Sequence, residues 1–288
     1  MIRLLGLCKV AAVFMFDFLA IYTLFHSAQA ATMLTGMIAL YVWLGGYFTL
    51  FKEGAVRSDE LPQYERGCLE RAKAQLVKDV NRISSADISN LKVYLIPGDS
   101  EMQATAYGAN CISVSQGTFD NTDPMMLNAV LGHEISHILH MDAEFSRAIF
   151  ATILLACGEI SVISFVFMVI IFPIFLICCL FRSWFGVIAY KGIIKAVKGI
   201  FQLFQKGLVV IYRVVAGCVS RAAEFRCDRY SAQLGYGVQL AHFLLYAAPD
   251  YPRQMTITEA LYRSHPSSAK RVARLESFIR DETHPVLR

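Results

Sequence analysis

The sequence predicts an α+β, mostly helical protein in which a water-soluble domain with a small β-sheet is joined to three or four transmembrane helices. The first observation is composition: 56% of the 288 residues are hydrophobic and only 17% are charged, and the mean hydropathy is +0.46. The second is distribution, because the apolar residues fall in long runs of the kind that a bilayer buries. The stretches between these runs carry both helical and strand patterns.

Charge and cysteine content exclude some classes of protein. The net charge of +4 is small and spread along the chain, so no nucleic-acid partner is expected. The eight cysteines include no C-x-x-C pair and form no disulfide framework. Five of them lie in or beside apolar runs, where a thiol behaves as a small hydrophobe. We therefore expect a reducing compartment and no metal site built from cysteines.

Residues 1–55 are predicted to form a transmembrane hairpin. The apolar runs 10–25 and 30–51 each approach the roughly 20 residues that a helix needs to cross a bilayer, and the link HSAQ between them is short. Lys and Arg flank both ends of the hairpin and are absent from its tip, so both ends are expected in the cytoplasm. An alternative stays open for residues 1–30, which also resemble a cleavable signal peptide. Asp17, an acid in the apolar run, argues against cleavage.

Residues 56–150 are expected to be the first part of the soluble domain. Residues 61–83 have helical spacing with mixed charges on the open face. Residues 91–97, LKVYLIP, form a short strand pattern, and residues 110–119, NCISVSQGTF, form another with a glycine turn after it. Asp123 and Pro124 then have the residue types of an N-cap and a first helical position, so a helix is expected to begin there.

Residues 151–220 are predicted to be a second membrane segment. Residues 160–181 form an uncharged run interrupted only by Pro173, whereas the following stretch places Lys191, Lys195 and Lys198 at steps of four and three on an apolar helix. That helix is either a fourth crossing, which would complete a second hairpin, or an amphipathic helix in the membrane interface; the choice for residues 182–220 stays open. Residues 221–288 return to charged helical patterns and are expected to complete the soluble domain.

An H-E-x-x-H motif, His133 to His137, lies on the helix that the capping residues predict independently. Two histidines four residues apart share one face of a helix, so their imidazoles can bind a single ion. Glu134 lies beside that ion, where its carboxylate can take a proton from an attacking water. The motif therefore predicts one Zn²⁺ per chain.

Two histidines leave zinc short of a protein ligand. A metzincin extension would need glycine at position 140 and histidine at 143, and the chain has His140 and Ala143 instead. Glu224 and Asp228 share a face of a predicted helix: Glu224 could complete the site with one position left open, and Asp228 could accept the Nδ1–H of a ligand histidine. The spacing is equally consistent with two acids that only pair with their basic neighbours Arg221, Arg226 and Arg229.

The order of these motifs resembles that of the HtpX-type membrane zinc metallopeptidases, whose architecture recurs in the CAAX prenyl endopeptidases. HEISH at 133–137 is followed by an apolar segment and then by EFRCD at 224–228. VYLIPGDSEMQATAYG resembles the family's strand and Asn-Ala-Phe-Ala-x-Gly segment, and CISVSQGTF resembles the strand that follows. SHPSSAKRVARL resembles its Ser/Thr-His-Pro motif with an arginine six residues after the histidine. The resemblance covers the chain from the first hairpin to the C-terminal helix and implies a gluzincin-like zinc metallopeptidase domain.

The resemblance assigns roles residue by residue. It implies zinc binding by His133, His137 and Glu224, catalysis by Glu134, and a supporting role for Asp228. His265 and Arg271 would lie over the open side of the zinc and stabilise the oxyanion. His140 and Asp142 also match family positions, and we interpret both as structural.

The resemblance also suggests where substrate binds. An extended polypeptide is expected to add to the edge of the 111–115 strand through backbone hydrogen bonds, with Ile112 and Val114 in that strand and Gln103 beside it. Gln103 stands where the family usually has Asn, and Thr105 where it usually has Phe, so the effect of the longer amide side chain is open.

The favoured function is an integral-membrane zinc endopeptidase in a bacterial inner membrane that cleaves misfolded or damaged membrane proteins at the cytoplasmic face. Its partners would then be polypeptide substrates, membrane proteins in particular, and the lipid bilayer. One alternative is a narrow-specificity processing protease similar to the CAAX prenyl endopeptidase. Another is a non-catalytic membrane protein with a structural zinc site, which four protein ligands would close.

Overall fold

A computed structural model describes the whole chain except residues 1, 109, 183, 248–264 and 284–288. It confirms a mostly helical α+β fold with a small mixed sheet. The chain divides into two compact units, one made of Met1–Ala148 with Gly217–Arg288 and the other of Ile149–Ala216. Four helical stretches of the described residues are long and apolar enough to cross a membrane: α1, α2, α6 and the stretch that begins with α7.

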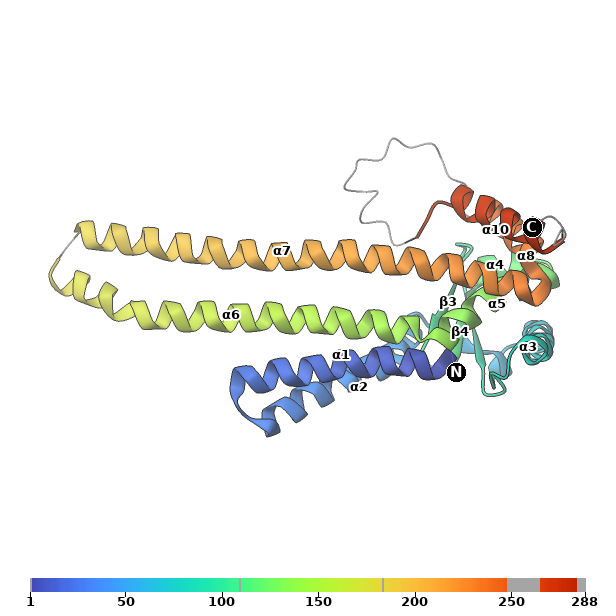
Figure 1. Ribbon diagram of the computed structural model, residues 1–288, viewed down its shortest axis with the longest axis horizontal. Helices are drawn as coiled ribbons and strands as arrows, with labels where there is room; N and C mark the ends of the chain where they lie inside the picture. The colour runs from blue at the N-terminus through green and yellow to red at the C-terminus, as the bar shows by residue number, and fades with distance from the viewer. Residues whose placement is uncertain (1, 109, 183, 248–264, 284–288) are drawn as a thin grey trace. The chain divides into compact units, whose positions relative to one another are not determined.

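The N-terminal hairpin is part of the first unit. Helices α1 (Ile2–Phe25) and α2 (Ala28–Lys52) pack side by side (Figure 1). Ser27 caps α2 by accepting a hydrogen bond from the Ala30 N–H at 3.2 Å, which satisfies one of the free amides at a helix start. The two apolar runs thus form the helices that the sequence predicts.

Helix α1 packs against the end of the helix that carries the H-E-x-x-H motif. A Cβ on Gly6 would stand 2.8 Å from the carbonyl oxygen of His140 and 3.0 Å from the side chain of Met141. Only glycine permits this approach without displacing a neighbour. The N-terminal hairpin is therefore packed directly against the soluble domain.

The sheet has four strands in the order β1-β2-β4-β3. Strands β2 (Lys92–Ile96) and β4 (Cys111–Ser115) are parallel, while β1 (Val56–Arg57) and β3 (Ala104–Tyr107) pair antiparallel at the two edges. Both strands expected from the sequence are present. The expected docking of substrate on the 111–115 strand is wrong, because β4 lies between β2 and β3 and has no free edge.

Helices cover the sheet and form one core with it. A short 3₁₀ turn η1 (Ser58–Glu60) precedes α3 (Gln63–Ile83), whose buried side chains recur at Leu69, Ala72, Leu76 and Val80, the spacing of one helical face. These side chains pack in a single cluster with residues of β2, β4 and the later helices. The later helices are α4 (Gln116–Asn121), α5 (Pro124–His140), α8 (Gly237–Ala247) and α10 (Ser268–Thr283).

Helix α5 begins and ends where its capping residues dictate. The Asp123 carboxylate accepts hydrogen bonds from the amides of Met125 and Met126 at 2.8 Å each, and Pro124 occupies the first turn. At the other end Met141 adopts a left-handed conformation with φ of 56° and donates its N–H back to the last turn. This left-handed residue stops α5 and lets the chain start α6 at once.

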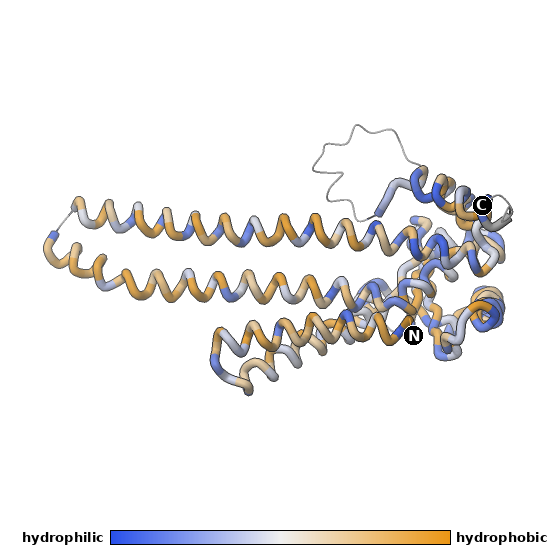
Figure 2. Tube along the Cα trace, in the orientation of Figure 1, coloured by the Kyte–Doolittle hydropathy of each residue, from blue (hydrophilic) through white to orange (hydrophobic). Residues whose placement is uncertain are grey.

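The second unit is a helical hairpin formed by parts of α6 (Asp142–Leu180) and α7 (Trp184–Ser231). Contacts recur along its length: the ring of Phe175 lies against that of Tyr190, Gln205 donates to Ser161, and Phe150 lies against Tyr212. Because α7 follows α6 in this way, the two helices either cross a membrane together or lie in its interface together. Figure 2 shows hydrophilic positions recurring along α7. After α7, a π-helical turn η2 (Ala232–Tyr236) leads into α8.

Candidate active site

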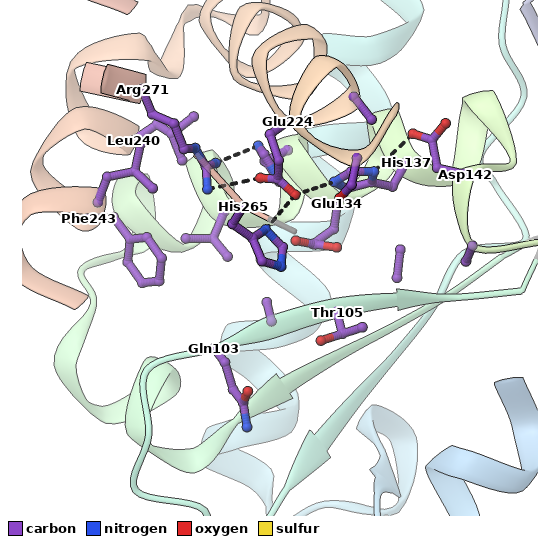
Figure 3. A pocket seen from close by; sticks show the side chains of 18 of the residues that line it. Gln103, Thr105, Glu134, His137, Asp142, Glu224, Leu240, Phe243, His265 and Arg271 are labelled. Carbon is purple, nitrogen blue, oxygen red and sulfur yellow. Dashed lines mark hydrogen bonds and ion pairs between the residues drawn. The ribbon is translucent and has the colours of Figure 1, made fainter. Parts of the chain in front are cut away.

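Three helices of the first unit bring the candidate site together (Figure 3). Helix α5 carries His133, Glu134 and His137, and the last turns of α7 carry Glu224 and Asp228. Arg271 comes from α10, and His265 lies just before that helix. These residues are far apart in the sequence, yet their side chains face one cavity or support those that do.

The two motif histidines converge on the Glu224 carboxylate. Nε2 of His133 lies 3.4 Å from Oε2 of Glu224, and Nε2 of His137 lies 3.7 Å from Oε1. Two atoms bound tetrahedrally to one zinc ion at about 2.0–2.2 Å stand about 3.3–3.6 Å apart. Both distances are close to this separation, so a zinc ion bound by these three side chains would fit here and would have a fourth position open.

Cys227 offers a rival third ligand, since its sulfur and one nitrogen of each motif histidine lie within 4.8 Å of one another. The carboxylate of Glu224 lies 3.4 Å from Nε2 of His133 and 3.7 Å from Nε2 of His137. Glu224 also lines the cavity, whereas the fully buried Cys227 does not. The geometry favours Glu224 over Cys227 as the third ligand.

Each motif histidine is held from behind by an aspartate. Nδ1 of His133 lies 3.0 Å from Asp228, as expected from the sequence, and Nδ1 of His137 lies 3.0 Å from Asp142. An aspartate at Nδ1 fixes the tautomer that directs the Nε2 lone pair toward a metal. Asp142, interpreted from the sequence as structural, thus occupies the same position behind His137 that Asp228 occupies behind His133.

Two arginines complete the support. Arg271 donates two hydrogen bonds to Asp228, at 2.6 and 2.9 Å, and its Nη1 lies 2.9 Å from Glu224. Arg226 donates to Asp142. Arg226, one of the basic neighbours that the sequence offered as partners for Glu224 and Asp228, donates instead to Asp142, while Arg271, which was not among those neighbours, holds Asp228. Both aspartates stay in contact with the histidines.

Electrostatics of the buried cluster suit metal binding and proton transfer. Burial lowers the pKa of His133, but the hydrogen bonds with Asp228 and Glu224 outweigh it and raise the pKa to about 9. A metal ion at Nε2 would therefore displace a proton. Burial raises the pKa of Glu134, although the neighbouring histidines and a hydrogen bond from the Ala106 N–H oppose the shift. A carboxylate with a raised pKa is a stronger base and suits proton transfer near neutral pH.

His265 lies at the open side of the cluster. Its Nδ1 is 2.9 Å from Oε1 of Glu224, and 64% of its side chain is exposed. The hydrogen bond with Glu224 raises the pKa of His265, so the ring is available as a donor. Arg271 differs from His265, because its guanidinium is bonded to Glu224 and Asp228. Its position is that of a group that balances the negative charge of these two acids.

The cavity in front of these residues has a volume of about 460 Å³. One wall is apolar and comes from α5 and α8, with Val130, Leu240, Phe243, Leu244 and Ala247. The opposite wall is the stretch from Met102 to Ala106, which includes β3. Gln103 lines this wall, and its amide donates to Asp99 at 2.7 Å. Ile112 and Val114 do not reach the cavity, because both are fully buried in the core.

The register of β3 shows which of its amides face the cavity. Gln103 accepts a hydrogen bond from the Ser115 N–H, so 103 and 115 form a hydrogen-bonded pair. Pairs alternate along an antiparallel ladder, which leaves the N–H and C=O groups of Ala104 and Ala106 pointing away from β4. The hydrogen bond from Ala106 to Glu134 agrees with this direction. The free edge next to the site is thus β3, a strand that the sequence had not identified as the docking edge.

The chain is similar to known metallopeptidases. Residues 70–279 match peptidase family M48. Protease HtpX of Legionella pneumophila (strain Lens) is 26% identical over 217 residues, covering 65% of this chain and 70% of that protein. A Protease HtpX homolog of Sulfurovum sp. (strain NBC37-1) is 24% identical over 294 residues, covering 85% of this chain and 97% of that protein.

Among solved structures, the crystal structure of S. mikatae Ste24p superposes with a TM-score of 0.52 at 18% identity. The match covers 92% of this chain but 62% of Ste24p, so the chain spans less than two thirds of that protein. At this identity the likeness concerns the fold.

Proposed function

The chain belongs to peptidase family M48, and on that premise we propose that it is an integral-membrane zinc endopeptidase that cleaves misfolded or damaged membrane proteins at the cytoplasmic face. The observation that carries the proposal is the approach of His133 and His137 to Glu224, with Glu134 beside them at the cavity. Three ligands and one open position are the arrangement of catalytic rather than structural zinc sites.

Substrate binding is assigned to β3. An extended polypeptide that pairs with the outward groups of Ala104 and Ala106 would lie across the cavity with its scissile carbonyl near Glu134. Pairing of this kind uses the backbone, so it selects extended segments more than particular side chains. Unfolded or damaged proteins supply such segments, which supports a broad substrate class over a narrow processing role. The apolar wall of α5 and α8 would accept one apolar side chain of the substrate.

Bound zinc would polarise the scissile carbonyl and lower the pKa of the attacking water. Glu134 takes the proton from that water and afterwards delivers it to the departing amine. His265 donates to the oxygen that becomes negatively charged. Arg271 holds Glu224 and Asp228 in place and contributes positive charge to the same region.

The cytoplasmic placement rests on charge. Arg3, Lys9 and Lys52 lie at the ends of the N-terminal hairpin that adjoin the soluble part of the first unit. By the positive-inside tendency these ends face the cytoplasm, and the site follows because α1 packs against the end of α5. A bacterial inner membrane is the location most consistent with the HtpX relatives.

Exchange of Glu134→Gln tests the catalytic assignment. Gln keeps the shape of the side chain but cannot take a proton, so cleavage of an unfolded polypeptide in detergent should fall by about 10²–10⁴-fold. Zinc content should stay at the level of the unmodified protein, because Glu134 is not among the proposed ligands. Glu276→Gln, on an exposed position of α10, is the matched control. Undiminished proteolysis by the Glu134→Gln protein would remove the assignment.

A further inference from the structure

A second cavity, of about 390 Å³, lies between the last turns of α7 and helix α10. It shares Asp228 and Arg271 with the candidate active site and contains none of the proposed zinc ligands. Its polar lining is mainly guanidinium, from Arg226, Arg229, Arg271 and Arg274, against the two carboxylates of Asp228 and Asp281. The lining therefore carries an excess of two positive charges.

Two of the four arginines are already engaged. Arg271 is bound to Asp228 and Glu224, and Arg226 donates to Asp142. Even so, Nε of Arg226 is buried and has no hydrogen-bond partner among the residues that the structure describes. A buried N–H donor without an acceptor costs free energy, so the donor capacity of the Arg226 guanidinium is not fully used.

The other two arginines are held by aromatic rings rather than by acids. The guanidinium of Arg229 lies 4.8 Å from the ring centre of Phe278, and that of Arg274 lies 4.5 Å from the ring of Phe225. Within the described part of the chain, neither forms an ion pair with a carboxylate. A stacked guanidinium is fixed in orientation while its N–H donors stay free, which prepares both groups for an anion.

We propose that this cavity binds a phosphate group, either from a free phosphate or phosphate ester or from the headgroup of an anionic phospholipid. Guanidinium groups that converge from two helices match a tetrahedral array of phosphate oxygens, and each can donate two parallel hydrogen bonds. The ligand would contact Arg229 and Arg274 and lie beside Arg226, which also lines the cavity.

The same site adjoins the metal centre through its arginines. Arg226 and Arg271 hold the aspartates behind His137 and His133. A phosphate group that accepts hydrogen bonds from these arginines would weaken their bonds to the aspartates. The aspartates in turn orient the ligand histidines. This gives the anion a means of influencing the active site without entering the catalytic cavity.

The test measures binding of inorganic phosphate to the full-length protein in phosphatidylcholine nanodiscs, at constant ionic strength, by calorimetry. Saturable binding is expected, and the double change Arg229→Gln with Arg274→Gln should weaken it by at least about tenfold. Arg229→Lys with Arg274→Lys keeps the charge and loses the planar fork, so its affinity should fall in between. Arg280→Gln, on an exposed position of α10 outside the cavity, should bind like the unmodified protein.

A second arm distinguishes the two sources of phosphate. In nanodiscs that contain phosphatidylglycerol, a headgroup ligand would occupy the cavity and compete with inorganic phosphate, whereas a soluble ligand would bind as before. Because binding is measured without substrate, the result does not depend on the proposed proteolysis. Absence of saturable phosphate binding in neutral nanodiscs, or equal binding by the Arg229→Gln, Arg274→Gln protein, overturns the proposal.

Discussion

Asp142 and Asp228 contact the Nδ1 atoms of the two motif histidines with the same geometry, yet the sequence pointed to only one of them. Asp228 lies four residues after Glu224 on one helix, a spacing that indicates a shared face. Asp142 follows His137 by five residues, which on a continuous helix would place it on another face. The left-handed Met141 between them turns the chain back toward the histidine. Left-handed residues are usually glycine, so a methionine at this position gives no sign of the turn in the sequence.

Changing either aspartate should weaken zinc binding. Asp142→Asn or Asp228→Asn leaves the side-chain shape but removes the charge that orients the imidazole and balances Arg226 or Arg271. Loss of such a support typically lowers metal affinity by about 10–100-fold, and competition with a chelator of known affinity measures the change. Asp87→Asn, at an exposed position, should have no effect. Equal zinc affinity of the Asp142→Asn and unmodified proteins would show that Asp142 does not support His137.

Helix α5 and strand β3 illustrate what local sequence does and does not predict. Asp123, Pro124 and the apolar spacing determine α5 within a few residues, because caps and one buried face act locally. Strand β3 has four residues and no strong strand formers except Tyr107 and Thr105. Its position at the edge follows from pairing with β4 across a turn, and strand order is not encoded in either segment alone. For this reason the sequence predicted substrate docking on β4 instead of on the edge strand β3.

The outward direction of the Ala104 amide makes β3 testable. Ala104→Pro removes an N–H that faces the cavity and leaves the ladder to β4 intact, because 104 and 114 form a non-hydrogen-bonded pair. One lost substrate hydrogen bond costs about 0.5–1.5 kcal/mol, so kcat/KM should fall about 2–13-fold at nearly unchanged thermal stability.

Thr105→Pro provides the contrast on the same strand. Thr105 pairs with Ser113 in the hydrogen-bonded position, so proline there removes a ladder bond and should lower the thermal unfolding temperature. If Ala104→Pro cleaves extended substrates at the unmodified rate, substrate does not pair with this edge.

Packing of α1 against α5 makes the N-terminal hairpin part of the catalytic unit rather than a detachable anchor. A side chain at Gly6 would meet the His140 carbonyl, two residues from Asp142. Gly6→Val should therefore destabilise the protein by about 1–3 kcal/mol through overpacking, seen as a lower temperature of thermal inactivation. Gly36→Val is the matched control on α2, since a Cβ there has no atom within 4 Å. Equal inactivation of the two variants would mean that α1 does not brace α5.

For the molecule as a whole, the sequence predicted the helices and strands better than the connections between them. The long apolar runs, the helix caps, the H-E-x-x-H motif and the Glu224–Asp228 pair are local patterns. Each corresponds to an element or a side-chain cluster in the structure. The support of Asp228 by Arg271 and the arginine-lined cavity depend on the contact of α7 with α10. That contact joins segments separated by residues 248–264, and no local pattern predicts it. The cavity wall formed by Leu240 and Phe243 was missed for the same reason.

The hairpin of the second unit places three lysines of α7 beside the uncharged run of α6. Its contacts set Tyr190 beside Phe175 and Gln205 beside Ser161, so Lys191, Lys195 and Lys198 lie alongside the middle of the uncharged run 160–181. That run spans about 33 Å as a helix, close to the hydrocarbon thickness of a bilayer. A helix that is apolar on every side is stable in lipid and not in an interface, so we expect both helices to cross. The lysines must then face water within the membrane, because charges there seldom face lipid.

Sidedness of thiol labelling decides between crossing and interfacial placement. In a chain whose eight native cysteines are replaced and which still cleaves substrate, Arg182→Cys at the turn between α6 and α7 should react with an impermeant charged reagent only from the outer side. Arg71→Cys on α3 should react only from the cytoplasmic side, and Lys195→Cys should react because water reaches it. Reaction of positions 182 and 71 from the same side would place the hairpin in the interface. In that arrangement the lysine stripe would face headgroups, and the uncharged run 160–181 of α6 would lie partly outside the lipid tails. Exposure of its apolar surface would be energetically costly.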